Sequence, residues 1–327
     1  MSRAPVQRQL RLVEVGLRDG LQAVPRVLDT STKVQIVERL ISAGVREIEV
    51  ASFAHPAVLP QLADAADVLA AVPRTDGVVY RALVPNLRGA QRAADTAVDV
   101  VVALVSCDEK VSRINQGRSV EDVLRELPHI GAVARESGKE FVVGIAMAFF
   151  APCAGLTSAE VRETVADRCV EAGARGVYFA DTVGMADPVQ ITSALRETRA
   201  RHADLEIGLH LHARNGFALA NAYAALQTGV DWLESAFCGL GGDMWFPGTP
   251  DVLGNLATED LLALTSAINV ETGIDSGAYE AVSLAAAQAT GAPRRDHVGR
   301  GGSRGQLAAM SWNEIMSRFE GVTTVSG

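Results

Sequence analysis

Short apolar runs alternate with longer amphipathic stretches along almost the whole chain. Apolar runs of this length, rich in Val, Ile and Leu, are typical of buried β-strands. Eight of them are predicted strands, at residues 10–15, 47–52, 78–83, 98–105, 141–146, 176–180, 206–212 and 232–236. The helix-like segments between them include residues 32–43, 58–71, 120–137, 158–172 and 218–228. In the first of these segments Thr32 lies near a plausible N-terminal cap, and Gly44 follows its end.

The order of these segments predicts the fold class. Eight strands, each followed by a helix, within about 230 residues favour an α/β fold of the (β/α)₈ TIM-barrel type. An open doubly wound sheet is the alternative, and it would favour a Gly-x-Gly-x-x-Gly turn after the first strand. Residues 15–20 do not have that spacing. We therefore expect one barrel domain over residues 1–275 and a short C-terminal extension over residues 276–327.

The C-terminal extension differs in composition from the barrel region. Residues 278–290 are predicted as one more helix, and residues 293–305 are rich in Arg and Gly. This segment could fold over the active face, contact a neighbouring subunit, or form a solvated tail. At the other end, the apolar stretch after Gln9 is short and is interrupted by Glu14. We therefore expect no signal peptide, no membrane span and a cytoplasmic protein.

The composition excludes several classes of protein. The 327 residues include 30 Lys and Arg against 39 Asp and Glu, and the resulting formal charge of −9 argues against a nucleic-acid partner. With 48% hydrophobic and 21% charged residues, the chain can bury a substantial core and is not wholly disordered. The four cysteines have no paired or Cys-x-x-Cys spacing, so neither a disulfide framework nor a zinc ribbon is expected.

Two histidines lie on one face of a predicted strand. Because side chains alternate along a strand, Leu209 and Leu211 point one way while His210 and His212 point the other. In a parallel barrel the apolar set meets the helices, which leaves both imidazoles inside, at the C-terminal mouth. Such a pair can ligate a single metal ion. The alternative is a structural pair that is hydrogen-bonded to neighbouring carbonyl groups.

Charged residues lie at the ends of other predicted strands. Arg18 and Asp19 occupy a glycine-flanked turn after the first strand, where barrel enzymes place catalytic groups, although a local ion pair is the alternative. Asp19 could join the metal, and Arg18 could stabilise an enolate or bind a carboxylate. Glu49 faces the barrel interior and needs a partner, for which Arg18 is the natural candidate. Asp181, after the sixth strand, could hydrogen-bond a ligand histidine or cap the next helix.

A glycine-rich loop follows the eighth predicted strand. It occupies residues 239–254 and contains Trp245 and Phe246, which could shield the site from water. A loop in this place suits a lid that closes on substrate or a phosphate-binding turn. Asn255, directly after the loop, could present its amide oxygen to the metal. Alternatively, Asn255 caps the helix that starts near Ala257.

These blocks resemble those of the 3-hydroxy-3-methylglutaryl-CoA lyase family of metal-dependent carbon–carbon lyases. The matching blocks lie at residues 13–22, 49–53, 85–87, 181–184, 210–212, 218–221, 239–242 and 254–260. They occur in one order and without large gaps over most of the chain. The wider superfamily also contains homocitrate and isopropylmalate synthases and some aldolases, all with a metal-binding barrel.

The resemblance implies a divalent metal cofactor, Mg²⁺ or Mn²⁺, and assigns residues to it. The implied metal ligands are Asp19, His210, His212 and, as a fourth, Asn255. Arg18 is implied to stabilise the enolate oxygen, and Glu49 and Asp181 to organise the site. The implied partner is a small-molecule substrate, either a carboxylated hydroxy acid or an acyl-CoA. The resemblance also implies a homodimer.

Two positions depart from the family pattern. The family has a catalytic cysteine after the Gly-Gly of the eighth loop, in a Gly-Gly-Cys-Pro-Tyr pattern, whereas this chain has Asp243. A carboxylate can replace a thiol as a proton shuttle, so Asp243 is the predicted acid–base group. After His212 the family usually has Asp-Thr-Tyr-Gly, whereas Arg214 and Asn215 could here bind a further substrate carboxylate. These changes predict a substrate other than hydroxymethylglutaryl-CoA.

The leading prediction is a divalent-metal-dependent lyase or aldolase that cleaves a carbon–carbon bond next to a hydroxyl group, by retro-aldol or retro-Claisen chemistry. Its predicted catalytic residues are Arg18, Glu49, Asp181 and Asp243. One alternative is a Claisen-type synthase that condenses an acyl-CoA with a 2-oxo acid. The other is a non-catalytic barrel that keeps the metal without the chemistry.

Overall fold

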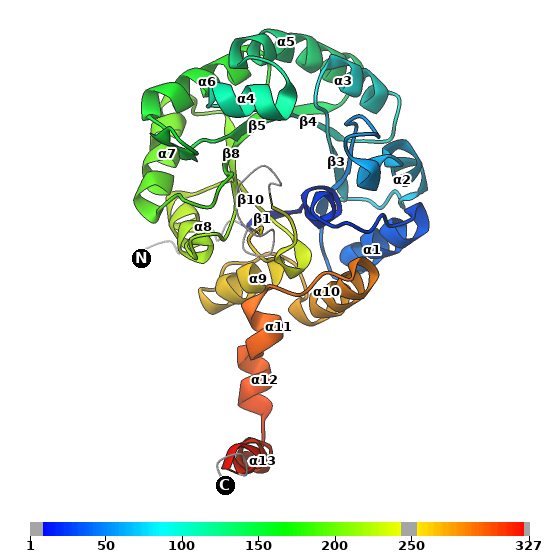
Figure 1. Cartoon of the computed structure of the whole chain (residues 1–327), viewed down its shortest axis with the longest axis vertical. Helices are drawn as coiled ribbons and strands as arrows, with labels where there is room; N and C mark the ends of the chain where they lie inside the picture. Colours follow the sequence, from blue (N-terminus) through cyan, green and yellow to red (C-terminus); the bar gives the residue numbers. More distant parts are fainter. Residues whose placement is uncertain (1–8, 243–253, 324–327) are drawn as a thin grey trace, which may run out of the picture.

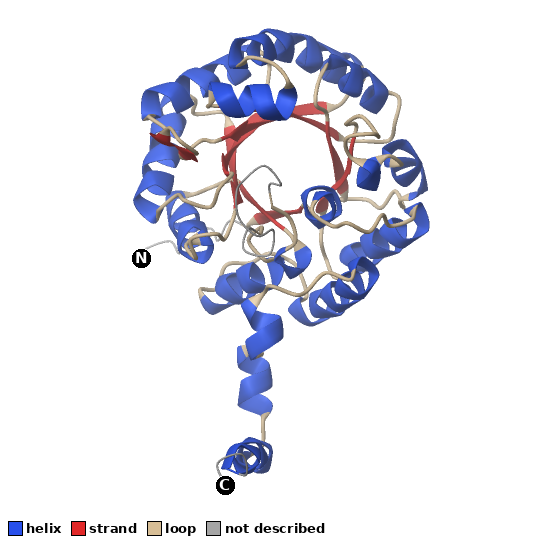
Figure 2. Cartoon of the chain, in the orientation of Figure 1, coloured by secondary structure: helices blue, strands red, loops and turns tan. Residues whose placement is uncertain are grey.

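Eight parallel strands form a closed barrel in the computed structural model, which describes residues 9–242 and 254–323. The neighbours around the barrel follow the order β1-β10-β9-β8-β5-β4-β3-β2. The barrel strands are β1 (Arg11–Glu14), β2 (Glu47–Ser52), β3 (Val79–Leu83), β4 (Val100–Ser106), β5 (Glu140–Ala146), β8 (Gly176–Asp181), β9 (Glu206–Leu211) and β10 (Trp232–Ser235). Figure 2 shows the strands as an inner ring with the helices outside it. The predicted TIM barrel is confirmed.

All eight predicted strands are present, and their ends lie within two residues of the predicted ones. Their Val- and Ile-rich runs are local signals, because strands covered by helices on one face and by the barrel core on the other are apolar throughout. The structure adds a hairpin outside the barrel, formed by β6 (Phe150–Ala151) and β7 (Gly155–Leu156). Strands of two residues are too short to show any periodicity, so the sequence did not predict them.

The outer layer consists of helices that follow the strands in sequence (Figure 1). They are α1 (Thr30–Ser42), α2 (Ala65–Ala71), α3 (Leu87–Ala94), α4 (Glu109–Gln116), α5 (Val120–Glu136), α6 (Ala159–Glu171), α7 (Pro188–Arg201), α8 (Ala218–Thr228), α9 (Thr258–Ala267) and α10 (Ser276–Thr290). Three short helical turns also occur, at η1 (Gly16–Gly20), η2 (Pro60–Leu62) and η3 (Phe237–Gly239).

One predicted helix is divided in the structure, and the cap of another lies near its predicted place. The single helix expected over residues 58–71 is divided into η2 and α2, because Pro60 disfavours helical backbone at the residue before it. The N-terminal cap of α1 is Asp29, whose side chain accepts a hydrogen bond of 2.7 Å from the Thr32 backbone N–H. The cap therefore lies near Thr32, whose backbone N–H is the donor that the cap satisfies.

The barrel interior combines apolar side chains with buried charges. Val13, Val100 and Trp232 belong to its apolar cluster, while Ile207 and Leu209 face the helices. The Trp232 ring lies over Gly208, where any Cβ would overlap it. Glycine at this position therefore makes room for a large aromatic ring inside the barrel. The charged residues of the interior are Glu47, Glu49, Arg81 and Glu234.

The C-terminal helices first complete the outer layer and then leave it. Helix α10 packs against α1 and η3, and Asp260 accepts backbone hydrogen bonds from His297 and Val298 at the start of α11 (His297–Gly301). Helices α12 (Arg304–Ala309) and α13 (Trp312–Thr323) then extend away from the barrel (Figure 1). Between α10 and α11, Arg295 contacts the segment after β10: its backbone N–H donates to the Cys238 carbonyl at 3.0 Å and its Nη1 to the Gly241 carbonyl at 3.5 Å. The predicted division into domains at residue 275 stays a prediction.

None of the helices in the described ranges combines the length and the apolar character needed to span a membrane.

Glu14 is a buried carboxyl group that links the loops after β1 and β10. It accepts hydrogen bonds from the backbone N–H of Gly16 at 2.8 Å and of Phe237 at 3.0 Å. It also accepts hydrogen bonds from the hydroxyl groups of Thr258, at 2.8 Å, and Tyr279. These partners come from η1, η3, α9 and α10. One side chain thus connects the segment that follows the first barrel strand with the segments that follow the last one.

Glu14 is expected to make stability depend on pH. Burial raises the pKa of Glu14 from 4.5 to about 7, although four hydrogen bonds oppose the shift. Between these pH values the folded protein retains a proton on Glu14 that the unfolded chain releases. The stabilising contribution of this proton to the free energy of unfolding is therefore present at pH 4.5 and is lost as the pH rises to 7. We expect wild type to lose up to about 3 kcal/mol of unfolding free energy relative to Glu14→Gln between pH 5 and pH 8. Urea unfolding of both proteins across this pH range measures the difference. Free energies of unfolding that change in parallel with pH in the two proteins would contradict the prediction.

Candidate metal centre

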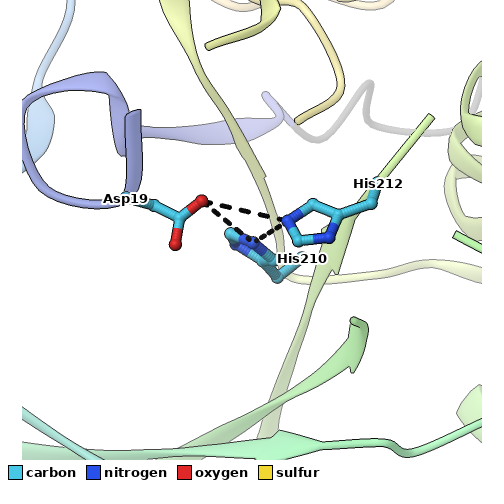
Figure 3. A group of neighbouring side chains, drawn as sticks. All are labelled: Asp19, His210 and His212. Carbon is cyan, nitrogen blue, oxygen red and sulfur yellow. Dashed lines mark hydrogen bonds and ion pairs between the residues drawn. The ribbon is translucent and has the colours of Figure 1, made fainter. Parts of the chain in front are cut away.

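Three side chains converge at the C-terminal mouth of the barrel. Strand β9 carries His210 and leads into His212, and Asp19 lies in η1 directly after β1. The two Nε2 atoms are 3.1 Å apart, and Asp19 Oδ2 lies 4.0 Å from that of His210 and 3.9 Å from that of His212. Figure 3 shows the three side chains pointing toward one common position. One carboxylate and two imidazoles at these spacings form a possible divalent-metal site.

The other nitrogen of each imidazole is held by the protein. His210 Nδ1 lies 3.0 Å from Glu234 Oε2, and His212 Nδ1 lies 2.7 Å from the backbone carbonyl oxygen of Thr182. Acceptors at both Nδ1 atoms favour the tautomer in which Nδ1 carries the proton and the Nε2 lone pair points at the site. This arrangement is the one that a metal-binding histidine needs. The alternative predicted from the sequence was a structural pair that is hydrogen-bonded to neighbouring carbonyl groups. It describes His212 but not His210.

Asn255 lies beside the three residues and offers a further oxygen. Its Nδ2 donates hydrogen bonds of 2.7 Å to Asp19 Oδ2 and to the Leu240 carbonyl. Its Oδ1 is buried and has no hydrogen-bond partner within the described part of the chain. A buried carbonyl oxygen without a donor fits a place in a metal coordination sphere. The alternative role as a helix cap is wrong, since α9 begins at Thr258 with Ala257 as its N-cap residue.

Arg18 is buried between two carboxyl groups. Its Nε donates to Glu49 Oε2 at 2.6 Å and its Nη1 to Asp19 Oδ1 at 2.8 Å, so the predicted contact with Glu49 is present. Burial acts to lower the pKa of Arg18, but Glu49 and Asp19 outweigh it and raise that pKa. Burial likewise acts to raise the pKa of Asp19, but Arg18 and the two imidazoles hold it well below its usual range. The guanidinium group is thus a fixed positive charge next to the metal position.

The hydrogen bonds of Asp181 match neither of its two predicted roles, as the partner of a ligand histidine or as a helix cap. Its Oδ1 accepts backbone hydrogen bonds from Met185 at 2.8 Å and Ala186 at 3.0 Å. These bonds shape the turn after β8, and the N-cap of α7 is Asp187. The partners at Nδ1 of the two site imidazoles are Glu234 and Thr182. Asp181 Oδ2 is buried without a hydrogen-bond partner among the described residues, and a catalytic role for this carboxyl group stays a prediction.

The predicted acid–base residue Asp243, with Trp245 and Phe246, lies outside the described residues. The nearest cysteine in the sequence, Cys238, is fully buried and donates through Sγ to the Ser283 carbonyl of α10. Burial raises the pKa of the Cys238 thiol to about 12. This thiol is therefore not poised to take the place of the family cysteine.

Two groups that hold the site were missed by the sequence analysis. Glu234 shares the inner face of β10 with Trp232 and Ala236, so the alternation that singled out Glu49 could also have found it. The Thr182 carbonyl is a backbone group and carries no sequence signal.

Asn215, which was predicted as a substrate contact, accepts from the Phe217 N–H at 2.9 Å and donates to the Ala186 carbonyl at 3.3 Å.

Gly241 packs directly on the metal position. Its φ is +118°, and a Cβ there would overlap Asn255 Nδ2 and lie 2.6 Å from Asp19 Oδ2. We expect Gly241→Ala to weaken Mn²⁺ binding by at least about tenfold, because it displaces the side chains around the ion. Gly216→Ala is the control, since φ is also positive there but the added Cβ meets open space. Isothermal titration with Mn²⁺ measures both, and equal affinities would contradict the expectation.

The fold agrees with comparisons to known proteins. Residues 9–284 match the HMGL-like family. The (R)-citramalyl-CoA lyase of Chloroflexus aurantiacus is 36% identical over 301 residues, which cover 89% of this chain and 94% of that protein. The hydroxymethylglutaryl-CoA lyase YngG of Bacillus subtilis is 32% identical over 270 residues, with coverages of 83% and 89%.

Solved structures show the same architecture. An HMG-CoA lyase from Acinetobacter baumannii, in complex with coenzyme A and 3-methylmalate, superimposes with a TM-score of 0.86. The match covers 92% of this chain and 97% of that one, at 27% sequence identity. The predicted resemblance to the hydroxymethylglutaryl-CoA lyase family is confirmed.

Proposed function

Because the chain belongs to the HMGL-like family of metal-dependent carbon–carbon lyases, we propose that it cleaves a 3-hydroxyacyl-CoA thioester that carries a free carboxylate. The observation that carries this proposal is the convergence of Asp19, His210 and His212 beside the buried guanidinium group of Arg18. A bound divalent ion would supply Lewis acidity toward the substrate hydroxyl group and its neighbouring oxygen. Asn255 Oδ1 would be a fourth protein ligand.

The protein residues then have separate tasks in the bond cleavage. The substrate hydroxyl loses its proton, the carbon–carbon bond breaks as the ketone forms, and the electron pair passes to the carbon next to the thioester carbonyl, which forms an enolate. Arg18 is the cation that stabilises the enolate oxygen, because Glu49 and Asp19 hold its guanidinium group in one position. The enolate carbon finally accepts a proton, which gives the shorter acyl-CoA.

Asp243 is the proposed donor of that proton and the acceptor of the hydroxyl proton. The residue stands at the position of the family cysteine in the Gly-Gly-Cys pattern. We expect Asp243→Asn to lower kcat by about 100-fold or more, because an amide cannot exchange the proton. Mn²⁺ affinity should be unchanged, and single-turnover assays would measure the chemical step directly. Full turnover of Asp243→Asn would reject this assignment.

The proposed substrate is citramalyl-CoA or a close analogue in place of hydroxymethylglutaryl-CoA. The relative from Chloroflexus aurantiacus acts, by its name, on (R)-citramalyl-CoA. In citramalyl-CoA the carboxylate is bonded to the carbinol carbon, whereas in hydroxymethylglutaryl-CoA one methylene separates them. Cleavage would yield acetyl-CoA and pyruvate from the first, or acetyl-CoA and acetoacetate from the second. The replacement of the family cysteine by Asp243 also favours a substrate different from that of the family.

Product analysis tests the substrate proposal. The Mn²⁺-loaded protein is incubated with (R)- and (S)-citramalyl-CoA and with hydroxymethylglutaryl-CoA, and pyruvate and acetoacetate are quantified separately. We expect kcat/KM to favour citramalyl-CoA by about 10-fold or more, since one methylene is worth 10- to 200-fold in a fitted pocket. A preference for hydroxymethylglutaryl-CoA would overturn the substrate but keep the reaction class. Free coenzyme A release from acetyl-CoA and a 2-oxo acid would instead support the synthase alternative, which the comparisons do not favour.

The metal identity and the assembly stay predictions. A donor set of carboxylate, amide oxygen and two imidazoles without a thiolate suits Mn²⁺ or Mg²⁺, and reconstitution of the metal-free protein with each ion would distinguish them. The predicted homodimer can be checked by light scattering of the purified protein. The predicted cytoplasmic location has no test in the structure.

A further inference from the structure

A layer of buried charge lies directly beneath the metal position, inside the barrel. Arg81 on β3 and Glu47 on β2 contact each other through Arg81 Nε and Glu47 Oε1 at 2.7 Å and through Arg81 Nη2 at 2.5 Å. Arg81 is 1% exposed and Glu47 7% exposed. On the other side, Arg81 Nη1 lies 3.5 Å from Glu234 Oε1 on β10. One guanidinium group therefore connects three strands across the interior of the barrel.

The two carboxylate oxygens of Glu234 contact different groups. Its Oε1 faces Arg81 and accepts a hydrogen bond of 3.2 Å from the Trp232 indole N–H. Its Oε2 lies 3.0 Å from His210 Nδ1. The Arg81 guanidinium carbon lies 5.0 Å from the centre of the Trp232 ring, so these two anchors also contact each other. The Glu234 carboxyl group therefore contacts Arg81 and Trp232 through Oε1 and His210 through Oε2.

We propose that Arg81 and Trp232 are positioning residues of the metal centre, which hold Glu234 so that His210 presents Nε2 to the ion. This inference rests on the proposed function only in requiring that a metal binds there. It assigns no contact between Arg81 or Trp232 and substrate.

Stability alone does not account for this layer. Barrel interiors are filled mainly by branched apolar side chains, and burying an ion pair costs about as much in desolvation as the pair returns. An apolar set of the same volume would pack the barrel at least as well. What an apolar set could not do is bind a carboxylate in a single orientation. The charged layer is thus explained by its effect on Glu234 and, through it, on His210.

The experiment compares Mn²⁺ affinity among variants of the full-length protein by isothermal titration. We expect Arg81→Met to weaken Mn²⁺ binding by about 10- to 100-fold, the usual effect of removing a partner of a metal-ligating histidine. Arg162→Met is the matched control. Arg162 is buried and lies within 6.0 Å of the Phe149 and Phe179 ring centres, and it pairs with Glu197, but it belongs to α6 outside the barrel. Its Mn²⁺ affinity should stay within about twofold of wild type.

Two further readouts separate positioning from a merely structural role. Trp232→Phe keeps an aromatic, though smaller, ring and removes the N–H donor to Glu234, and it should weaken Mn²⁺ binding by a few-fold even where Arg81→Met fails to fold. Imidazole ¹⁵N shifts of the metal-free protein should show a loss of the fixed Nδ1–H tautomer at His210 in both variants.

Wild-type Mn²⁺ affinity in Arg81→Met and Trp232→Phe, with an unchanged tautomer, would overturn the inference while leaving the lyase proposal intact. A wild-type protein that binds no divalent ion would overturn both. A protein that binds Mn²⁺ with the expected variant effects but cleaves none of the thioesters would support the positioning role and reject the proposed substrate.

Discussion

Asp19→Asn is expected to weaken Mn²⁺ binding by more than about 100-fold and to lower kcat by about 1000-fold or more. The substitution keeps the shape of the side chain but removes the negative charge that lies within 4.0 Å of both Nε2 atoms. An amide would also place a donor where Arg18 and Asn255 already donate to Asp19. The ion would therefore lose its one acidic ligand among the described residues.

Titration with Mn²⁺ and steady-state kinetics over a range of metal concentrations measure this effect. The control is Asp231→Asn. Asp231 is buried directly before β10, away from the metal position, where it accepts from the Ile207 N–H near the start of β9 and pairs with Arg199. It is expected to lower stability without changing metal affinity. Unchanged Mn²⁺ affinity in Asp19→Asn would show that the three side chains do not form the metal site.

Arg18→Gln is expected to lower kcat by about 100- to 1000-fold through the loss of the cation at the developing enolate. It should also destabilise the fold by about 3–5 kcal/mol, because Glu49 is left as a buried carboxyl group without its partner. These two effects have different origins, and one further substitution separates them.

The double variant Arg18→Gln/Glu49→Gln removes both charges of the pair. Its stability in urea should recover toward wild type, since two amides can hydrogen-bond without a buried charge. Its kcat should stay as low as that of Arg18→Gln, because no cation faces the enolate. Recovery of turnover in the double variant would instead mean that Arg18 only neutralises Glu49 and does not contribute to catalysis.

The parts of the site that could be predicted from sequence depend on local alternation. His210 and His212 share one strand face at any barrel geometry, and Leu209 and Leu211 then face the helices. Glu49 could be assigned to the interior in the same way, and the contact with Arg18 followed because β1 and β2 are neighbours. Asp19 and Asn255 could be considered as further ligands from their places after predicted strands, and the family resemblance assigned both to the metal.

Other features were not predictable because they depend on turns and backbone groups. The division of residues 58–71 into η2 and α2 depends on how the chain turns at Pro60, and the partner of His212 is a backbone carbonyl. The role of Asp181 depends on the turn at Met185 and Ala186, which no periodicity describes.

The sequence by itself determined the eight strands, their order with the helices, and the faces on which the charged residues lie, because periodicity acts over a few residues. Only the tertiary structure decided which of those residues meet. Asp19 and Asn255 are 236 positions apart and touch because the barrel closes between β1 and β10. Arg81 reaches Glu234 across the interior only at the strand register that the closed barrel imposes. Closure and register depend on the packing of all eight strands at once, which no local segment encodes.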